Sequence, residues 1–196
     1  TPTPSSAASD VYKRQASILK YMQENRNKSP GVNLALQRLN EMDLSINEVN
    51  HTLPVESRHE NILDISIKEI DNPSLQEIAF KLSAAKRYLV WREDNNNFYK
   101  HGADVGQGYR KCNLHTQLIG PNAGGYFQSD FILGFFLLGP WTLYRDHRHA
   151  APELYLNLSN RTGWRIKSRN WQDYSAGSFV WNLSLIHISE PTRPRL

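Results

Sequence analysis

The residues best suited to chemistry lie together in one short segment, His147-Arg-His149-Ala-Ala-Pro-Glu153-Leu-Tyr155. Residues two apart on an extended strand point to the same face, so His147 and His149 can present two imidazoles to one point. Glu153 and Tyr155 share that parity, although Pro152 is expected to interrupt the strand. Two neutral imidazoles and one carboxylate are ligands for a first-row transition metal, with positions left open for a substrate.

A His-x-His pair alone is a weak signal, because two surface histidines at the end of a solvated strand give the same pattern. The added carboxylate of Glu153 and the preceding Gly139 favour the metal site. We therefore predict that His147, His149 and Glu153 bind a divalent transition metal. Iron, manganese, zinc, nickel and cobalt all suit this ligand set, so the sequence leaves the metal open.

The segment lies in the second half of a chain that changes from helical to strand-like sequence. Apolar residues recur at the spacing of one buried helix face over residues 75–85, and earlier helices are expected over 16–24 and 32–42. Short strands are predicted at residues 113–119, 131–138, 153–158, 163–166 and 178–181. The nearly unbroken apolar strand 131–138 suits burial on both faces. We therefore predict an α+β fold, with helices ahead of an antiparallel barrel or sandwich.

Both ends of the chain resemble translated adapter sequence from a transposase-made library. Asp10–Gln15 can be encoded by a DNA string whose reverse complement encodes Leu183–Ile188. An inverted repeat of this kind is expected of two adapter arms and not of two native termini. We therefore expect residues 1–15 and 183–196 to be adapter-derived, and the native sequence to continue beyond Asn182.

Composition excludes several classes of partner. The net charge is +4, from 23 basic and 19 acidic residues, and without the two terminal stretches no Lys/Arg cluster marks a nucleic-acid footprint. The longest apolar run, residues 131–140, is too short to span a bilayer. A single cysteine, Cys112, excludes an internal disulfide framework and fits a reducing compartment. We expect one cytoplasmic domain with a small-molecule substrate and no nucleic-acid or membrane partner, and a homodimer stays open.

The spacing His-x-His-x-x-x-Glu resembles the first conserved motif of the cupin superfamily. Residues 82–182 resemble the cupin-type dimethylsulfoniopropionate lyase family more closely. The features that carry this resemblance are the helix Leu82–Val90 ending at Trp91, Leu118-Ile-Gly-Pro121, Leu137-Leu-Gly-Pro140, Tyr144-x-x-His147-x-His149-x-x-x-Glu153-x-Tyr155, Leu158-Ser159, Trp164 and Trp171. The resemblance implies a cupin (double-stranded β-helix, or jelly-roll) barrel over residues 93–182, incomplete at its C-terminal end. The helices of residues 16–92 would pack on it.

By this resemblance His147, His149 and Glu153 bind the metal, Tyr155 is the catalytic base and Tyr144 lies in the substrate pocket. The implied reaction is a β-elimination that splits dimethylsulfoniopropionate into dimethyl sulfide and acrylate. The metal would act as a Lewis acid on the substrate carboxylate. A cation beside Tyr155 would favour its phenolate form. Aromatic faces could hold the sulfonium group, and the candidates are Trp141, Tyr144, Trp164 and Trp171. Only Tyr144 has a motif position that supports this role.

The sequence also departs from the family pattern. Pro152 stands where members often have an acidic residue, and Asn160 replaces the glycine that usually closes the motif. The second motif, whose histidine completes the metal site, would fall beyond Asn182. His187 lies almost at that position but belongs to the stretch predicted to be adapter-derived. We therefore expect the fourth ligand to be lost by truncation and this fragment to be inactive.

Two other classes of function fit the same residues. A cupin enzyme of another type, such as a dioxygenase or an isomerase, would use the same ligands with different pocket walls. Tyr155 together with Tyr144 favours the lyase, since a dioxygenase has no obvious need for a phenolate base. A non-catalytic small-molecule-binding cupin, for instance a sensor module, is the third class, and a fused DNA-binding domain in the parent gene would favour it.

Overall fold

The computed structural model describes residues 16–42, 58–94, 106–121, 126–147, 151–166, 170–183 and 187–191. Helices occupy the first half and strands the second, which confirms the predicted α+β class. Residues 16–24 are helical and are followed by η1 (Arg26–Lys28), α2 (Pro30–Glu41), α3 (Glu60–Lys68), η2 (Pro73–Leu75), α4 (Gln76–Ala85), η3 (Lys86–Tyr88) and α5 (Gln107–Lys111). Within these ranges no helix has the length and apolar character needed to cross a membrane.

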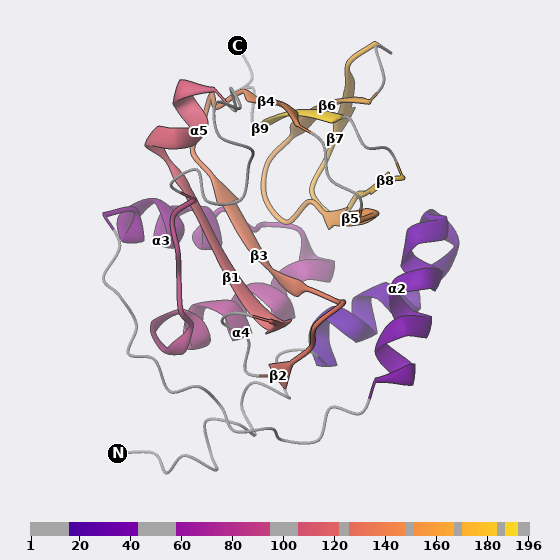
Figure 1. Cartoon of the computed structure of the whole chain (residues 1–196). Helices are drawn as coiled ribbons and strands as arrows, with labels where there is room; N and C mark the ends of the chain where they lie inside the picture. Colours follow the sequence, from indigo (N-terminus) through magenta and orange to yellow (C-terminus); the bar gives the residue numbers. More distant parts are fainter. Residues whose placement is uncertain are drawn as a thin grey trace.

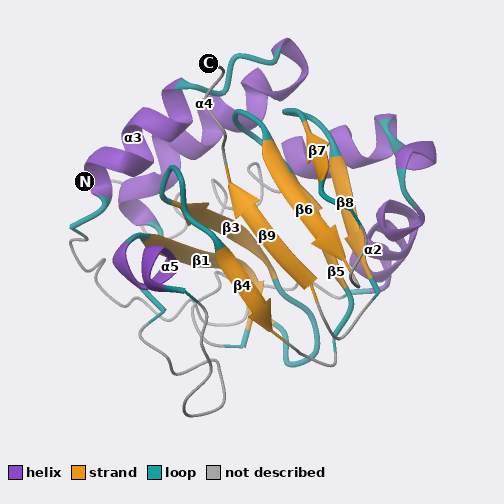
Figure 2. Ribbon diagram, turned by 90° about the horizontal axis from the view of Figure 1, so that it is seen from above, coloured by secondary structure: helices purple, strands orange, loops and turns teal. Residues whose placement is uncertain are grey.

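The strands form three sheets (Figures 1 and 2). They are β1 (Asn113–Gly120), β2 (Tyr126–Phe127), β3 (Leu133–Leu138), β4 (Tyr144–His147), β5 (Glu153–Leu156), β6 (Thr162–Ile166), β7 (Gln172–Tyr174), β8 (Phe179–Asn182) and β9 (His187–Pro191). The sheet orders are β2-β1-β3, β4-β9-β6-β7 and β5-β8. Among the described strands no pairing joins the three sheets into a closed barrel, so the cupin barrel stays a prediction.

The helices cover one face of the β1–β3 pair (Figure 2). The predicted apolar face of residues 75–85 is confirmed, because Leu75, Ile78, Ala79, Leu82 and Ala85 are all buried. These side chains share one hydrophobic core with three strand residues, Leu114, Leu118 and Leu137. The periodic apolar spacing therefore gives α4 its place against the sheet.

The prediction that strand 131–138 is buried on both faces is wrong. Leu133, Phe135 and Leu137 face the helices, whereas Phe136 is 39% exposed. Phe136 lies opposite His115 in the β1–β3 register. The helices thus cover one face of this pair, and the other face carries a polar and aromatic mixture that the unbroken apolar run conceals.

The N-terminal helices also hold the turn before β8. The Tyr21 hydroxyl donates to the carbonyl of Gly177 at 2.8 Å, and the Asn72 amide donates to the carbonyl of Ala176 at 3.1 Å. The Tyr21 ring packs on Phe179 with centroids 5.8 Å apart. Gly177 has a φ of +86°, a conformation that favours glycine. The helical part and the strands are therefore packed as one body at β8.

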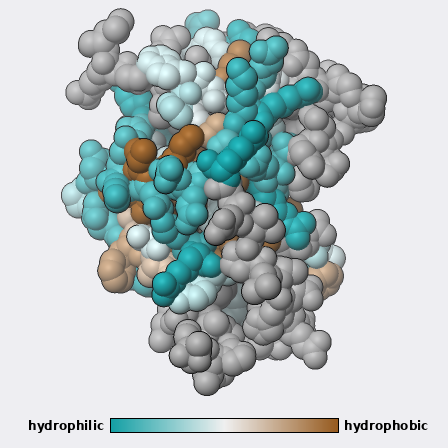
Figure 3. Space-filling model, turned by 90° about the vertical axis from the view of Figure 1, so that its left-hand side faces the viewer, coloured by the Kyte–Doolittle hydropathy of each residue, from teal (hydrophilic) through white to brown (hydrophobic). Residues whose placement is uncertain are grey.

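The described residues on the face shown in Figure 3 are mainly hydrophilic, with a small group of hydrophobic residues among them. Over the described residues, large exposed hydrophobic side chains lie on several different elements, among them Leu34 on α2, Ile65 on α3 and Phe80 on α4. Scattered exposures of this kind are ordinary for a globular surface.

Candidate active site

Glu153 and Tyr155 lie two residues apart on β5, and their side chains meet. The Tyr155 hydroxyl donates to Glu153 Oε2 at 2.8 Å. The strand begins at Glu153, immediately after Pro152, and pairs with β8 so that Glu153 lies opposite Asn182 and Tyr155 opposite Val180. Glu153 and Tyr155 therefore share one face of β5. The expected interruption at Pro152 is confirmed, because β4 ends at His147 and β5 begins at Glu153 in a different sheet.

Tyr155 connects two sheets. Its ring lies 4.7 Å from the ring of Trp164 on β6, at an interplanar angle of 51°. Trp164 is buried, at 8% exposed, and its indole nitrogen donates to the Thr162 hydroxyl at 3.0 Å. Through this contact Tyr155 faces the β4-β9-β6-β7 sheet, in which His147 is the last residue of β4.

The β4–β9 pairing places His147 in register with His187. The backbone register joins Tyr144 to Ser189 and His147 to His187, with an irregularity between the two pairs. Between these pairs, two residues of β4 (145 and 146) thus lie opposite one residue of β9 (188), which is the arrangement of a β-bulge. Without the bulge, positions 144 and 147 would fall on opposite faces. With the bulge, positions 144 and 147 lie opposite residues 189 and 187 of β9, which are two apart and share one face of the sheet.

The same face of this sheet is turned toward Tyr155. In the β6–β9 register Trp164 lies opposite Ser189 and Ile166 opposite His187. Residues directly opposite each other in a sheet share a face. The positions of His147 and His187 therefore have the parity of Trp164, whose ring contacts Tyr155. His149 and the side chains of His147 and His187 lie outside the described residues.

Tyr144, the predicted substrate-pocket residue, is 5% exposed and lies in an aromatic group. Its ring stacks on Tyr109 of α5, with centroids 4.3 Å apart and an interplanar angle of 7°. Phe136 of β3 approaches edge-on at 5.9 Å. Tyr144 is thus held between the β1–β3 pair and α5, while its strand leads directly to His147.

Two other aromatic candidates for a sulfonium pocket lie nearer the surface. Trp141 is 63% exposed and has a φ of +60°. Trp171 is 37% exposed, with the Arg165 guanidinium 5.1 Å from its ring centroid. Of the aromatic residues considered for this pocket, Tyr144 and Trp164 are therefore the buried ones.

His115 on β1 is a further titratable residue, which lies outside the predicted metal-binding motif. It is half-buried, and burial lowers the pKa of its imidazole. The nearby Asp94 charge opposes this lowering of the pKa, and Arg92 adds to it. The signal was present in the sequence as the alternation of His115 and Gln117 with Leu114 and Leu118, but polar residues on a strand ordinarily indicate a solvent face.

Within the described ranges, no group of three or more His, Cys, Asp or Glu side chains is arranged to hold a metal ion. Those ranges leave out His149 and the imidazoles of His147 and His187. The predicted ligand set therefore stays a prediction, to which the structure adds the position of Glu153.

Comparison with known proteins identifies the family. The sequence matches the family model for dimethylsulfoniopropionate lyase over residues 28–190. Two solved structures are similar in fold. One comes from a study of the DMSP lyases RdDddP and RnDddQII, with a TM-score of 0.67 and 15% identity, covering 95% of this chain and 87% of that one. The other is the DMSP lyase DddQ from Ruegeria pomeroyi DSS-3, with a TM-score of 0.66 and 19% identity, covering 93% and 86%.

A comparison with curated protein sequences gives no match. The family match spans most of the chain and includes the helices from α2 onward and β1 to β8. The chain therefore belongs to the dimethylsulfoniopropionate lyase family, a family of carbon–sulfur lyases.

Proposed function

We propose that this protein splits dimethylsulfoniopropionate into dimethyl sulfide and acrylate by a metal-dependent β-elimination inside a cupin barrel. The metal ligands are His147, His149 and Glu153, the base is Tyr155, and Tyr144 lies in the substrate pocket. The observation that carries the proposal is the 2.8 Å hydrogen bond from the Tyr155 hydroxyl to Glu153 Oε2. It brings the proposed base into direct contact with a proposed ligand.

The residues present fit a divalent transition metal. A carboxylate and a phenol meet on β5, and the face they are turned toward carries the register position of His147. Imidazole and carboxylate are donors for iron, manganese, zinc, nickel and cobalt alike. When bound, the metal would supply a Lewis acid that stabilises the charge developing on the substrate carboxylate.

In this reaction Tyr155 takes a proton from the carbon next to the substrate carboxylate, and the electron pair of the broken carbon–hydrogen bond stays on that carbon. That electron pair forms the carbon–carbon double bond while the bond to sulfur breaks. The sulfonium leaves as neutral dimethyl sulfide, acrylate remains, and the proton ends on Tyr155 Oη. A free tyrosine has a pKa of about 10, so the base form must be stabilised. Positive charge beside Glu153 would favour the phenolate.

Tyr155 is held for this task by two contacts that do not need its proton. Trp164 packs against its ring, and the β5–β8 pairing fixes its backbone opposite Val180. Removal of the hydroxyl alone should therefore leave the ring in place. This makes Tyr155→Phe a clean test of the base.

The test belongs in the full-length parent protein, because the sequence after Asn182 is predicted to be non-native here. In Tyr155→Phe, release of dimethyl sulfide into the headspace should fall by about 10²–10⁴-fold, the usual range for loss of a general base. Metal content, measured on the same samples, should stay at the wild-type level.

Tyr174→Phe is the matched control. Tyr174 also lies on a strand, and its hydroxyl donates to a side chain two residues away, Gln172, at 3.0 Å. Its loss should change activity by no more than a few-fold. A Tyr155→Phe protein with nearly full activity would remove Tyr155 from the role of base. A wild-type parent that holds metal but releases no dimethyl sulfide would refute the proposed reaction.

A further inference from the structure

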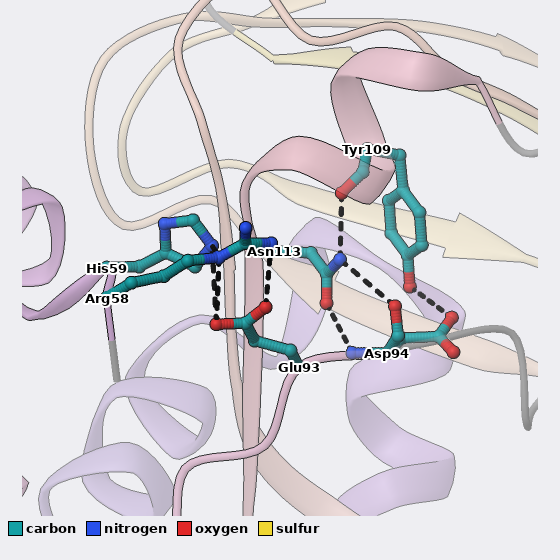
Figure 4. A network of polar contacts seen from close by, with 6 residues as sticks. All are labelled: Arg58, His59, Glu93, Asp94, Tyr109 and Asn113. Carbon is teal, nitrogen blue, oxygen red and sulfur yellow. Dashed lines mark hydrogen bonds and ion pairs between the residues drawn. The ribbon is translucent and has the colours of Figure 1, made fainter. Parts of the chain in front are cut away.

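Asp94, Tyr109 and Asn113 form a buried polar network (Figure 4), and Tyr109 also stacks on Tyr144. The Tyr109 hydroxyl donates to Asp94 Oδ2 at 2.8 Å. The Asn113 side chain accepts from the Asp94 backbone N–H at 2.6 Å and donates to the Tyr109 carbonyl at 2.8 Å. Asp94, Tyr109 and Asn113 are 5%, 3% and 1% exposed. Three separate segments thus meet: the chain before residue 95, α5 and the start of β1.

The network reaches Tyr144 through ring stacking. Tyr109 uses its hydroxyl for Asp94 and one face of its ring for Tyr144, with centroids 4.3 Å apart and planes nearly parallel. Phe136 closes the edge of Tyr144 at 5.9 Å. The Asp94 carboxylate contacts the Tyr109 hydroxyl, and the Tyr109 ring contacts the Tyr144 ring, so a change at Asp94 can reach Tyr144 through Tyr109.

The backbone of Asp94 is held independently of its carboxylate. Asn113 already fixes the Asp94 backbone, through the bond to its N–H and a second contact from the Asn113 amide to its carbonyl at 3.4 Å. A neutral amide at position 94 could still accept the Tyr109 hydroxyl. The carboxylate differs from that amide mainly in charge, and its charge is felt nearby, since it opposes the lowering of the His115 pKa.

A hydrogen bond to an ionised acceptor is stronger than a neutral one and polarises its donor. A polarised phenol carries more electron density in its ring, and the attraction of a cation to an aromatic face depends on that density. The substrate of the proposed reaction carries a fixed positive charge on sulfur. The buried Asp94 carboxylate, bonded to Tyr109, would therefore raise the affinity of the stacked Tyr144 ring for the sulfonium group of the substrate.

We propose that Asp94 and Tyr109 are positioning residues that orient Tyr144 and tune it electrostatically for the cationic sulfonium end of the substrate. The inference rests on the proposed function, in which Tyr144 lines the substrate pocket. Asp94 and Tyr109 touch neither substrate nor metal, and their effect is on substrate binding and on discrimination by charge.

The decisive probe is a neutral isostere. 4-Methylpentanoate has the shape and carboxylate of dimethylsulfoniopropionate, with a carbon in place of the cationic sulfur. In the metal-loaded full-length parent, Asp94→Asn should raise KM for dimethylsulfoniopropionate by about 3- to 10-fold, less than the roughly 30-fold worth of a complete cation–π contact, with kcat changed less than about three-fold. The inhibition constant of 4-methylpentanoate should stay within about two-fold.

Two further variants separate charge from packing. Tyr109→Phe keeps the stack on Tyr144 and removes the hydrogen bond to Asp94. It should therefore also weaken binding of the substrate and leave binding of 4-methylpentanoate unchanged. Tyr109→Leu removes the stack and should weaken both. Asp64→Asn serves as the control, because Asp64 is a more exposed carboxylate that pairs with Lys86.

The outcomes are distinct. If Asp94→Asn weakens binding of both ligands equally, Asp94 is a structural residue and the inference fails. The same holds if the variant lowers the melting temperature without a selective loss of binding to the cationic substrate. If Asp94→Asn changes neither ligand, it also fails. A metal-loaded wild type that releases no dimethyl sulfide would instead refute the proposed function. If Asp94→Asn does not fold, Tyr109→Phe gives the same comparison.

Discussion

Gly31→Ala should destabilise the protein because the new methyl group has no room. Gly31 is the second residue of α2, and its backbone lies against the Trp181 ring on β8. A Cβ at this position would lie 2.3 Å from Trp181 Cε3 and 2.5 Å from Cδ2, whereas ordinary contact begins at 3.4 Å. The ring or the helix must therefore shift by about 1 Å, and overpacking of this kind typically costs about 1–3 kcal/mol.

A gain in helix propensity opposes that loss. Alanine is favoured over glycine in a helix interior by up to about 1 kcal/mol, and by less in the first turn. The net loss should be about 1–2 kcal/mol, which lowers Tm by about 2–8 °C in a chain of this size. Thermal unfolding followed by circular dichroism measures the difference, with wild type and variant in the same buffer.

Gly108→Ala is the matched control. Gly108 lies within α5, and the nearest atom to its added Cβ is Thr142 Cα at 3.4 Å, an ordinary contact. This variant should be as stable as the wild type or slightly more so. A Gly31→Ala protein that is as stable as Gly108→Ala would refute the close packing of α2 against β8.

Three further predictions concern the site and its pH dependence. In the full-length parent, Glu153→Ala should abolish metal binding and activity together; metal at wild-type stoichiometry would show that Glu153 is not a ligand. The 196-residue chain itself should hold clearly substoichiometric metal after dialysis, and full occupancy that disappears in His187→Ala would show that His187 takes the fourth position. Burial lowers the pKa of both His59 and His115, so at mildly acidic pH the unfolded state binds more protons than the folded state. The free energy of unfolding in urea should therefore be highest above a pH of about 6.5, fall as the pH drops from there toward the lowered folded-state pKa values, and level off below them. His115→Gln should reduce that fall, and an unchanged pH dependence would contradict it.

Local sequence patterns predicted those parts of the fold that depend on periodicity. The apolar spacing of residues 75–85 located the buried face of α4, and the parity of Glu153 and Tyr155 located their shared face on β5. Both depend only on neighbours in the chain. Strand 131–138 was assigned the wrong burial because Phe136 faces the polar side of β1, where the sequence gives no sign of an aromatic neighbour such as Tyr144.

Features that depend on distant pairing could not be predicted. The bulge in β4 arises from its register with β9, about 40 residues further along the chain, and strand parity alone puts Tyr144 and His147 on opposite faces. The Tyr109–Tyr144 stack joins a five-residue helix to a strand, and neither element carries a motif for the contact. Asp94 and Asn113 likewise look like ordinary loop and strand-end residues until the chain is folded.

β9 lies within residues 183–196, the stretch expected to be adapter-derived, and it still occupies a central place in its sheet. In the order β4-β9-β6-β7 this strand pairs on both sides, with β4 and with β6. Without β9, both neighbours would present unpaired backbone donors and acceptors, which are templates for strand addition. Main-chain pairing is tolerant of sequence, so many different segments could occupy this position, including one donated by another molecule. A peptide supplied in trans could therefore complement the sheet, and a chain lacking this strand would be prone to self-association through the same gap.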